Sequence, residues 1–367
     1  MGEAMSEPYR VVQWATGSIG QIGIRHFADN PVYELVGVYV TNEEKVGKDA
    51  GQLAGTRTTG VAATNDVDAI LGLGADCVHY APLRADLDEI CRILRSGANV
   101  VTPAGYVFPT PKAEADFDAL RAACTEGGSS FHGTGIHPGF SGDLLPLVYA
   151  RLMSRVDQVQ VRETADFRVH PSAAMMEMLG FGTDPEALAE QQGGMLGMMK
   201  TAFEPSMRMV AEGLGAEVER ITLDFEAARA TRDLELRSMS IEAGTVGGMR
   251  FEFNAWCDGR PLVVFRTFWK VDDDLDPDWG YGNIKYHLQI DGDPSIEASF
   301  ESAHKHPDGD EGYWGRVWTA MNGINAIPAV CDAEPGVVTQ LDLGVVRPRG
   351  LVRPRTADFG EPIGLAR

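Results

Sequence analysis

The residues Ala15-Thr16-Gly17-Ser18-Ile19-Gly20 have the glycine spacing of a phosphate-binding turn. In the dinucleotide fingerprint G-x-G-x-x-G, the second glycine lets the backbone approach a pyrophosphate, and the third lets a helix pack closely on a strand. Gly17 and Gly20 hold those two positions, whereas Ala15 replaces the first glycine. The loop follows an apolar run and opens an amphipathic stretch, so helix N–H groups would face the phosphates. We predict that Thr16, Gly17, Ser18, Ile19 and Gly20 bind a dinucleotide.

A second group of candidate cofactor contacts follows the next predicted strand. An enzyme that selects NAD usually places an acidic residue about 20 residues past the glycines, where it binds the ribose 2′-hydroxyl. This chain has two neutral residues there and two lysines close behind: Thr41, Asn42, Lys45 and Lys48. Because this set favours a 2′-phosphate, we expect NADP. Glu43 and Glu44 favour NAD, which stays possible as the cofactor.

The order of predicted elements in the first half of the chain indicates how these loops are positioned. Short β-rich runs alternate with amphipathic stretches, which is typical of a parallel sheet with crossover helices. The expected strands cover residues 9–15, 33–40, a short segment near Val61, 75–82, 99–102 and 130–136. The expected helices cover residues 18–29, 84–96 and 111–126, and Gly97 follows the second of these as a terminating glycine. We therefore predict an α/β fold with an N-terminal Rossmann-type doubly wound parallel sheet over residues 1–150.

The second half has a different sequence pattern. From about residue 156 onward it contains long runs in which apolar and polar residues alternate. Asp258-Gly259 and Asp291-Gly292 lie between such runs and are typical of hairpin turns. A helical segment over residues 172–215 carries eight of the fourteen methionines. We predict a C-terminal α+β domain with a largely antiparallel sheet over residues 151–367, which serves the substrate and dimerisation. A helix over residues 314–331 is expected to pack back on the first domain.

Three predicted strands end in segments whose residues could surround a ligand, because ligands gather at the carboxyl ends of strands in an open parallel sheet. These segments are His79-Tyr80-Ala81-Pro82, Thr102-Pro103-Ala104-Gly105-Tyr106 and Gly133-Thr134-Gly135-Ile136-His137-Pro138-Gly139-Phe140. With the runs ATGSIG and VGVYVTNEEKVGKDAG, they make the N-terminal half resemble the dihydrodipicolinate reductase-like superfamily. Within it, the chain is most similar to the branch of 2,4-diaminopentanoate dehydrogenases and native amine dehydrogenases.

The resemblance implies an NAD(P)-dependent oxidoreductase that interconverts a C–N or C–O centre of a small substrate. It also implies a two-domain subunit, a homodimer and an active site in the cleft between the domains. The cofactor contacts that we carry over to the strand ends are Tyr80, Ala81, Pro82, Thr102, Pro103, Gly105 and Pro138. If the methionine-rich segment lines this site, the substrate is mostly apolar.

The chain departs from the family pattern at the position of the proton donor. The family carries a catalytic glutamate just after the fifth strand, where this sequence has Gly105 and Tyr106, and His137 replaces an asparagine in the family motif. Hydride transfer to C=O or C=N needs a proton donor within hydrogen-bond reach. We expect His137 and Tyr106 to be the catalytic residues. The alternatives near the start of the second domain are Glu163, Asp166 and His170.

Two other functions stay open. One is a carbonyl or alcohol dehydrogenase that uses His137 or Tyr106 as the acid. The other is a sensor that binds the dinucleotide without catalysing a reaction, because the family glutamate is missing. Turnover of any carbonyl substrate would separate an enzyme from a sensor.

Composition limits the partners of this chain of 367 residues. Its net charge of −21 disfavours nucleic acid and anionic membranes through like-charge repulsion. The five cysteines are widely spaced and form no C-x-x-C pair, so we expect reduced thiols and a cytoplasmic location. We find no sequence run that resembles a membrane span. The acidic run over residues 272–278 and the pair His304 and His306 do not match metal-binding motifs, so no metal is predicted.

Overall fold

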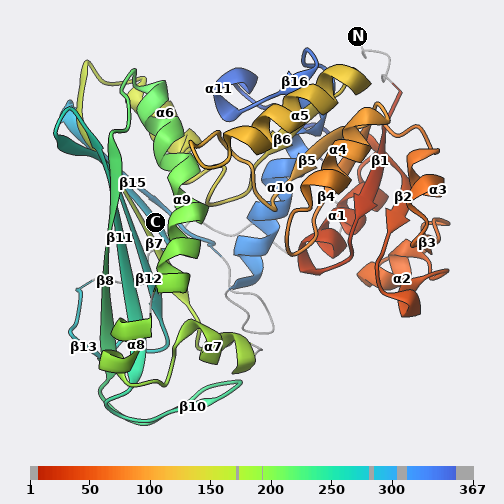
Figure 1. The fold of residues 1–367 in the computed structure, drawn as a ribbon. Helices are drawn as coiled ribbons and strands as arrows, with labels where there is room; N and C mark the ends of the chain where they lie inside the picture. Colours follow the sequence, from red (N-terminus) through yellow and green to blue (C-terminus); the bar gives the residue numbers. More distant parts are fainter. Residues whose placement is uncertain (1–6, 171–172, 192, 281–284, 304–311, 353–367) are drawn as a thin grey trace.

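The computed structural model describes residues 7–170, 173–191, 193–280, 285–303 and 312–352. Figure 1 shows two parts side by side, a parallel sheet enclosed by helices and a large sheet with helices on one side. The predicted α/β fold with a Rossmann-type sheet and a largely antiparallel second sheet is confirmed. Both sheets have seven strands among the described residues.

The first sheet is parallel throughout, with the order β16-β6-β5-β4-β1-β2-β3. Its strands are β1 (Tyr9–Trp14), β2 (Tyr33–Tyr39), β3 (Ala63–Thr64), β4 (Cys77–Tyr80), β5 (Asn99–Thr102), β6 (Ser130–Gly133) and β16 (Gly336–Val337). Without β16 the order is 3-2-1-4-5-6, that of dinucleotide-binding Rossmann domains. The six predicted strands are present, and β16 is an addition from the far end of the chain.

Helices cover both faces of the parallel sheet. They are α1 (Ser18–Asp29), the 3₁₀ turn η1 (Glu43–Lys45), α2 (Ala50–Ala54), α3 (Val67–Leu71), α4 (Leu87–Arg95), α5 (Glu114–Gly127), α10 (Gly312–Cys331) and α11 (Gln340–Leu343). α1 and α10 pack on one face, and α4 and α5 on the other. α4 begins three residues later than the predicted start at residue 84 because Asp86 caps it by accepting a hydrogen bond from the Glu89 N–H.

The second sheet has the order β13-β8-β11-β12-β7-β14-β15, and its pairs are antiparallel except β7 with β12. Its strands are β7 (Arg155–Asp166), β8 (Arg220–Ala230), β11 (Val246–Cys257), β12 (Arg260–Lys270), β13 (Leu275–Asp276), β14 (Tyr286–Asp293) and β15 (Ile296–Phe300). A small separate pair is formed by β9 (Leu234–Glu235) and β10 (Ser240–Ile241). Alternation along β11 places Phe251 and Phe253 in the core and Arg250 and Glu252 on the other face.

The two predicted hairpin turns have different outcomes. Asp258 and Gly259 connect β11 to β12, both with positive φ angles, as a tight hairpin turn requires. The second prediction is wrong, because Asp291 and Gly292 lie inside β14, where the pairing with β7 shifts register. A Cβ on Gly292 would lie 2.0 Å from the Arg155 carbonyl oxygen, so this glycine permits close strand approach rather than a turn.

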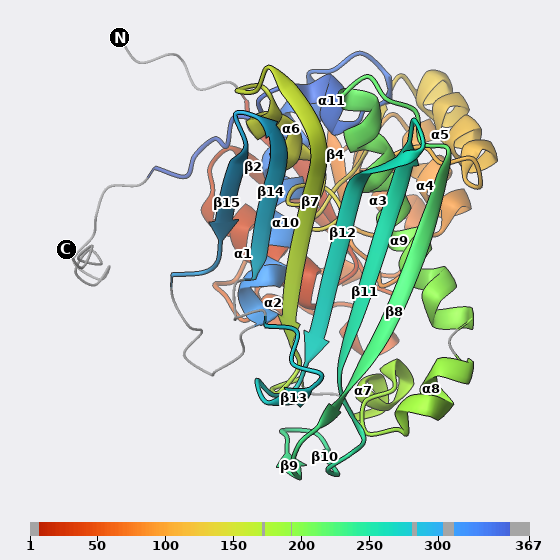
Figure 2. The same ribbon diagram turned by 90° about the vertical axis from the view of Figure 1, so that its left-hand side faces the viewer.

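One face of the second sheet is covered by α6 (Leu144–Ala150), α7 (Ala173–Leu179), α8 (Pro185–Gln191) and α9 (Gly193–Gly213). Of the methionines in this segment, Met176, Met199, Met207 and Met209 are buried and fill the core. Met195 and Met198 have side chains outside the described set. Figure 2 shows the opposite face of the sheet in front of these helices, and we call it the open face.

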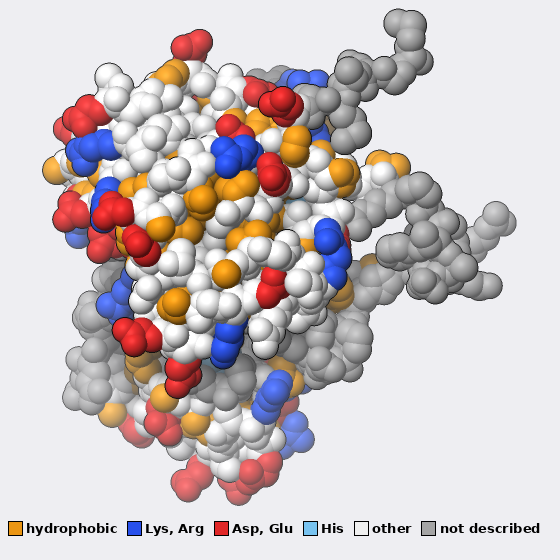
Figure 3. All heavy atoms as spheres, turned by 90° about the vertical axis from the view of Figure 1, so that its right-hand side faces the viewer, with side chains coloured by type: hydrophobic (Ala, Val, Ile, Leu, Met, Phe, Trp, Pro, Cys, Tyr) orange, Lys and Arg blue, Asp and Glu red, His pale blue; other side chains and the backbone are white. Residues whose placement is uncertain are grey.

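Figure 3 shows the face formed by the outer side of the N-terminal domain. Acidic and basic side chains are interspersed there, with small groups of hydrophobic side chains between them. Lysines and arginines on this face lie among carboxylates. They do not form the basic surface that a nucleic-acid site would require. No described helix is long and apolar enough to cross a membrane.

Two buried histidines make the stability of this domain depend on pH. Burial lowers the pKa of His79 and of His132 from 6.5 to about 4. In the folded chain both imidazoles stay neutral between about pH 6.5 and pH 4. In the unfolded chain they bind a proton below about pH 6.5. The free energy of unfolding should therefore be fully developed above pH 6.5 and fall toward pH 4, by about 1.4 kcal/mol per pH unit per histidine.

Chemical denaturation at a series of pH values checks this expectation. The variant H132Q removes one of the two titrating groups and should reduce the pH slope by one histidine's share. An unchanged slope in this variant would contradict the assignment of the slope to these two side chains.

Candidate active site

The predicted dinucleotide loop has the geometry that a pyrophosphate requires. Ala15 adopts φ +69°, a conformation that favours glycine, so it performs the turn expected of the missing first glycine. A Cβ on Gly20 would lie 2.1 Å from the Ala15 carbonyl oxygen, whereas one on Gly17 would have no neighbour within 4 Å. Gly20 is therefore fixed by packing, and the space above Gly17 is open for a ligand.

The N-terminus of α1 matches this open space. Gly17 is its N-cap residue, Ser18 and Ile19 form its first turn, and within the described chain no side chain caps it. Its first turn carries no acidic residue. The backbone N–H groups and the positive end of the helix dipole are thus available to an anion.

The predicted ribose-binding residues lie next to this loop. Lys45 Nζ donates to Thr16 Oγ1 at 3.0 Å, which places the lysine charge against the dinucleotide loop. Asn42 caps η1 by accepting a hydrogen bond from the Glu44 N–H at 2.9 Å. Thr41 and Lys48 are exposed. Of the two lysines, Lys45 is the one that contacts the loop among the described residues.

The segment after β4 contributes backbone rather than a tyrosine side chain. Tyr80 is fully buried, and its hydroxyl donates to Glu89 at 2.6 Å on the α4 side of the sheet. The Ala81 N–H donates to the Trp14 carbonyl oxygen at 3.0 Å, which holds the two strand ends together. Pro82 is half-buried at the start of the following loop.

The segment after β5 turns sharply and carries Tyr106 away from His137. The Thr102 carbonyl oxygen accepts from the Thr134 N–H at 2.8 Å, and Pro103 lies beside Gly135. Gly105 and Tyr106 both have positive φ angles.

The Tyr106 hydroxyl donates to Asp116 on α5, and its ring packs on Phe117 and Phe131 in the first-domain core. Burial, with Asp116 nearby, raises the pKa of Tyr106 to about 12. The structure does not bring the two predicted catalytic residues together, so the role of Tyr106 stays a prediction that this packing does not favour.

His137 forms a polar cluster with two residues of the second sheet. Its Nδ1 lies 2.7 Å from Glu163 Oε2 on β7, and the Tyr286 hydroxyl on β14 donates to Glu163 Oε1 at 3.3 Å. The imidazole packs against Phe203 and Phe265 and is 2% exposed, whereas the Glu163 side chain is 18% exposed. Because a carboxylate only accepts hydrogen bonds, His137 Nδ1 carries a proton. Glu163 is therefore the member of the cluster that a ligand can reach.

The His137 loop is held by amides from the C-terminal part of the chain. Asn322 on α10 donates to the carbonyl oxygens of Gly135 and Gly139 at 2.8 and 3.1 Å. Gln340 on α11 donates to the same Gly139 oxygen at 2.9 Å. Asp143 accepts from the Gly139 N–H and from Ser206 on α9, and burial raises the pKa of its carboxyl group. Pro138 lies within this clamped loop.

Aromatic residues continue the site away from the carboxylate. The Tyr286 ring stacks on Phe300 and lies 6.2 Å from the ring of Trp318 on α10. A cavity of about 240 Å³ lies beside Tyr286 and is lined mainly by apolar side chains, among them Phe140, Leu145, Val161, Leu288 and Phe300. Val161 precedes Glu163 on the same face of β7, so the cavity and the carboxylate share one face of the sheet.

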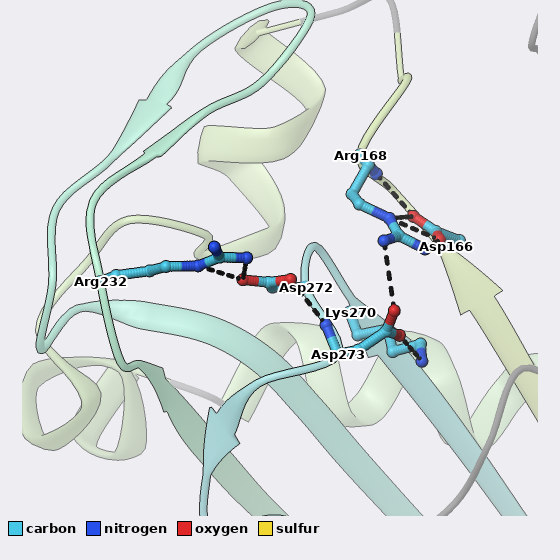
Figure 4. Close-up of polar contacts among 6 residues, drawn as sticks. All are labelled: Asp166, Arg168, Arg232, Lys270, Asp272 and Asp273. Carbon is cyan, nitrogen blue, oxygen red and sulfur yellow. Dashed lines mark hydrogen bonds and ion pairs between the residues drawn. The ribbon is translucent and has the colours of Figure 1, made fainter.

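Asp166 and His170 take other positions. Asp166 lies three residues beyond Glu163 and thus on the opposite face of β7. It binds Arg168 in a charged network at the end of β7 and β12, shown in Figure 4, that also contains Arg232, Lys270, Asp272 and Asp273. His170 packs against Phe167. The network joins the end of β7 to the turn after β12 and does not include the His137 cluster.

A metal site is not formed by the described residues, since no group of three or more His, Cys, Asp or Glu side chains is arranged to hold an ion. His304 and His306 lie outside the described residues.

Comparison with known proteins shows the relatives of this chain. Residues 140–354 match the 2,4-diaminopentanoate dehydrogenase C-terminal domain. An amine dehydrogenase of Streptomyces virginiae is 31% identical over 346 residues, which cover 90% of this chain and 95% of the relative. The chain belongs to this dehydrogenase family.

Solved structures of other dehydrogenases have the same fold. The amine dehydrogenase from Mycobacterium smegmatis superimposes with a TM-score of 0.73 at 22% identity, covering 93% of this chain and 98% of that one. Scyllo-inositol dehydrogenase from Lactobacillus casei, solved with NAD(H) and scyllo-inositol, gives a TM-score of 0.51 at 11% identity and covers 92% and 93% of the two chains.

The predicted family and the predicted class of enzyme, a dehydrogenase, are confirmed by these comparisons. The family match lies in the second half of the chain, where the sequence offered no sharp motif. The roles of individual site residues stay predictions. Sequence reasoning missed Tyr286, Asn322 and Gln340, whose positions depend on the packing of distant strands and helices and leave no local signal.

Proposed function

We propose that this chain is an NAD(P)-dependent dehydrogenase that acts on a C–N centre of a small, mostly apolar amine or imine. The observation that carries this proposal is the reachable carboxylate of Glu163, held by His137 and Tyr286 beside the loop that follows β6. The amine dehydrogenase of Streptomyces virginiae, similar over nearly the whole length, supports C–N chemistry.

The dinucleotide cofactor fits the residues present. Its pyrophosphate would be held by the N-terminus of α1 and the open space at Gly17, and the strand ends around Thr102, Pro103 and Gly135 would face the nicotinamide. When bound, a nicotinamide supplies or accepts the hydride. The NAD(H) bound to scyllo-inositol dehydrogenase, which shares the fold, supports this class of cofactor.

Glu163 is the group that we propose to handle the proton. A carboxylate in this position attracts a substrate ammonium or iminium ion and can accept a proton from the nitrogen. His137 acts as a positioning residue, because its Nδ1 proton fixes one carboxylate oxygen while the buried ring cannot reach a substrate. Glu163 thus supplies from β7 the carboxylate that the family pattern places after β5.

The apolar cavity beside Tyr286 supports a substrate with an apolar substituent. Carbonyl or alcohol chemistry is the alternative that uses the same cluster, and the non-catalytic sensor is a further one. Consumption of NADPH and NADH with small ketones and aldehydes, with and without concentrated ammonia, separates the three. Turnover that depends on ammonia supports the proposal, turnover without ammonia favours carbonyl reduction, and cofactor binding without turnover favours a sensor.

The proton-handling role of Glu163 predicts a selective loss of activity. The variant E163Q keeps the size of the side chain but removes its negative charge. We expect kcat to fall by about 100-fold or more while the cofactor dissociation constant stays unchanged. Steady-state kinetics and fluorescence titration of NADPH measure the two quantities.

The control is D166N, a matched change on the opposite face of the same strand, which should retain kcat. H137N, which installs the family's asparagine and retains an N–H donor, should lose less activity than E163Q. Equal activity of E163Q and the wild type would overturn the assignment.

We further propose that NADP is preferred over NAD, as Lys45 lies against the dinucleotide loop. A lysine near the ribose attracts a 2′-phosphate, although the net charge of the chain opposes it. The variant K45A should weaken NADPH binding about tenfold and leave NADH binding nearly unchanged. K112A is the control, because Lys112 is an exposed lysine outside the predicted cofactor contacts. Equal weakening of both cofactors by K45A would contradict the proposed role.

The open face supports the proposed homodimer. Its charged side chains form pairs of opposite sign, such as Arg266 with Glu252 and Arg250 with Glu226 at 2.6 and 3.2 Å. Such a surface can be self-complementary across a two-fold axis. Asn254 lies on this face of β11, opposite Thr222 on β8 and Val264 on β12.

The variant N254K introduces an unpaired charge there and should convert a dimer into a monomer in sedimentation velocity. D88K on the exposed surface of α4 is the control and should stay dimeric. A wild-type monomer would refute the dimer.

The cysteines form no disulfide, which supports our proposal of a reducing compartment such as the cytoplasm.

A further inference from the structure

We propose that Gln13 and His79, two buried polar residues beneath α1, fix the dinucleotide loop in its binding conformation before the cofactor arrives. Both are fully buried in the first domain, one on β1 and the other on β4. Neither faces the space above Gly17, so they act as positioning residues through the loop backbone. The inference rests on the proposed dinucleotide cofactor.

The Gln13 side-chain amide donates to three backbone carbonyl groups. Its Nε2 donates to the carbonyl oxygens of Ala15, Trp14 and His79 at 3.0, 3.1 and 3.2 Å. The opposite orientation of the amide would turn Oε1 toward three acceptors, so this network determines which end is nitrogen. The amide thus joins the end of β1, the first residue of the loop and the neighbouring strand β4.

His79 holds the other end of the same amide. Its Nδ1 lies 2.8 Å from Gln13 Oε1, an atom that only accepts, so the ring carries its proton on Nδ1. Burial keeps the imidazole neutral near pH 7, and its Nε2 has no hydrogen-bond partner among the described residues. His79 therefore uses its single N–H group to orient the glutamine.

Two glycines of α1 make room for this pair. A Cβ on Gly20 would lie 3.0 Å from Gln13 Nε2, and one on Gly23 would lie 2.4 Å from Gln13 Oε1 and 3.0 Å from His79 Nδ1. Gly20 is part of the fingerprint, but Gly23 is not, and its lack of a side chain is explained by the buried amide. The polar pair fits between the strands and the helix because neither glycine has a side chain.

The loop residue whose conformation this network stabilises is Ala15, which adopts φ +69° although it is not glycine. A non-glycine residue in this region carries strain and needs surrounding contacts that determine its conformation. The hydrogen bond from Gln13 to the Ala15 carbonyl oxygen is such a contact, and it precedes the Thr16 and Gly17 backbone that meets the pyrophosphate. A loop fixed in advance loses less conformational entropy when a ligand binds, which strengthens binding.

The test compares cofactor binding with turnover. The variants Q13M and H79L remove the amide and its orienting donor, and H79N retains an N–H donor close to the position of Nδ1. We expect Q13M and H79L to raise the NADPH dissociation constant and the cofactor KM about tenfold, with kcat nearly unchanged, and H79N to recover part of the loss. Fluorescence titration of the full chain gives the dissociation constant independently of activity.

H132L is the matched control, because His132 is an equally buried histidine of the same sheet whose Nδ1 bonds to the Val338 carbonyl oxygen instead of the loop. It should lower the thermal midpoint without weakening NADPH binding. Wild-type affinity in Q13M and H79L, or equal weakening by H132L, would overturn the proposal. If the wild type binds neither NADPH nor NADH, the proposed function itself is wrong, and the two failures are thus distinguished.

Discussion

The structure depends on satisfying the backbone of one loop, the segment from Thr134 to Asp143 that leaves the parallel sheet and enters the second domain. Buried carbonyl and N–H groups that lack partners are costly. Here the Gly139 carbonyl oxygen accepts from Asn322 and Gln340, and its N–H donates to Asp143. Both donors come from the C-terminal part of the chain, whereas the acceptor Asp143 lies four residues after Gly139. This constraint brings β6, α9, α10 and α11 together, and His137 meets Glu163 because the loop is held there.

Glu163, for which we propose a functional role, gains its position from this same arrangement. It lies on a strand of the second sheet, yet its hydrogen-bond partner His137 comes from a loop of the first. A carboxylate whose position depends on a residue of the other domain keeps its geometry only while the domains stay docked. The candidate site is therefore a property of the interface, where ligand sites often lie in proteins with two domains.

Local sequence patterns predict the parts of the fold that are governed by local physics. The glycine loop, the amphipathic helix after it and the alternating strands follow from spacing and periodicity, and α1 begins and ends at the predicted residues. The Asp258-Gly259 turn has the expected backbone, whereas Asp291-Gly292 has the same composition and lies within a strand. The difference is the Arg155 carbonyl group opposite Gly292, which a single sequence does not reveal. The site shows the same limit, because His137 stands out in its motif but its partner Tyr286 lies in an ordinary strand.

The strand β16 and the helix α10 complete a domain that begins at the other end of the chain. α10 packs on α1, and β16 pairs with β6 at the edge of the first sheet. A ribosome must therefore add more than 300 residues before this sheet has all its strands. N-terminal domains commonly fold first during synthesis. Here the nascent first domain has to wait until the second domain has been made, and the part of its apolar sheet face that α10 covers stays exposed until then.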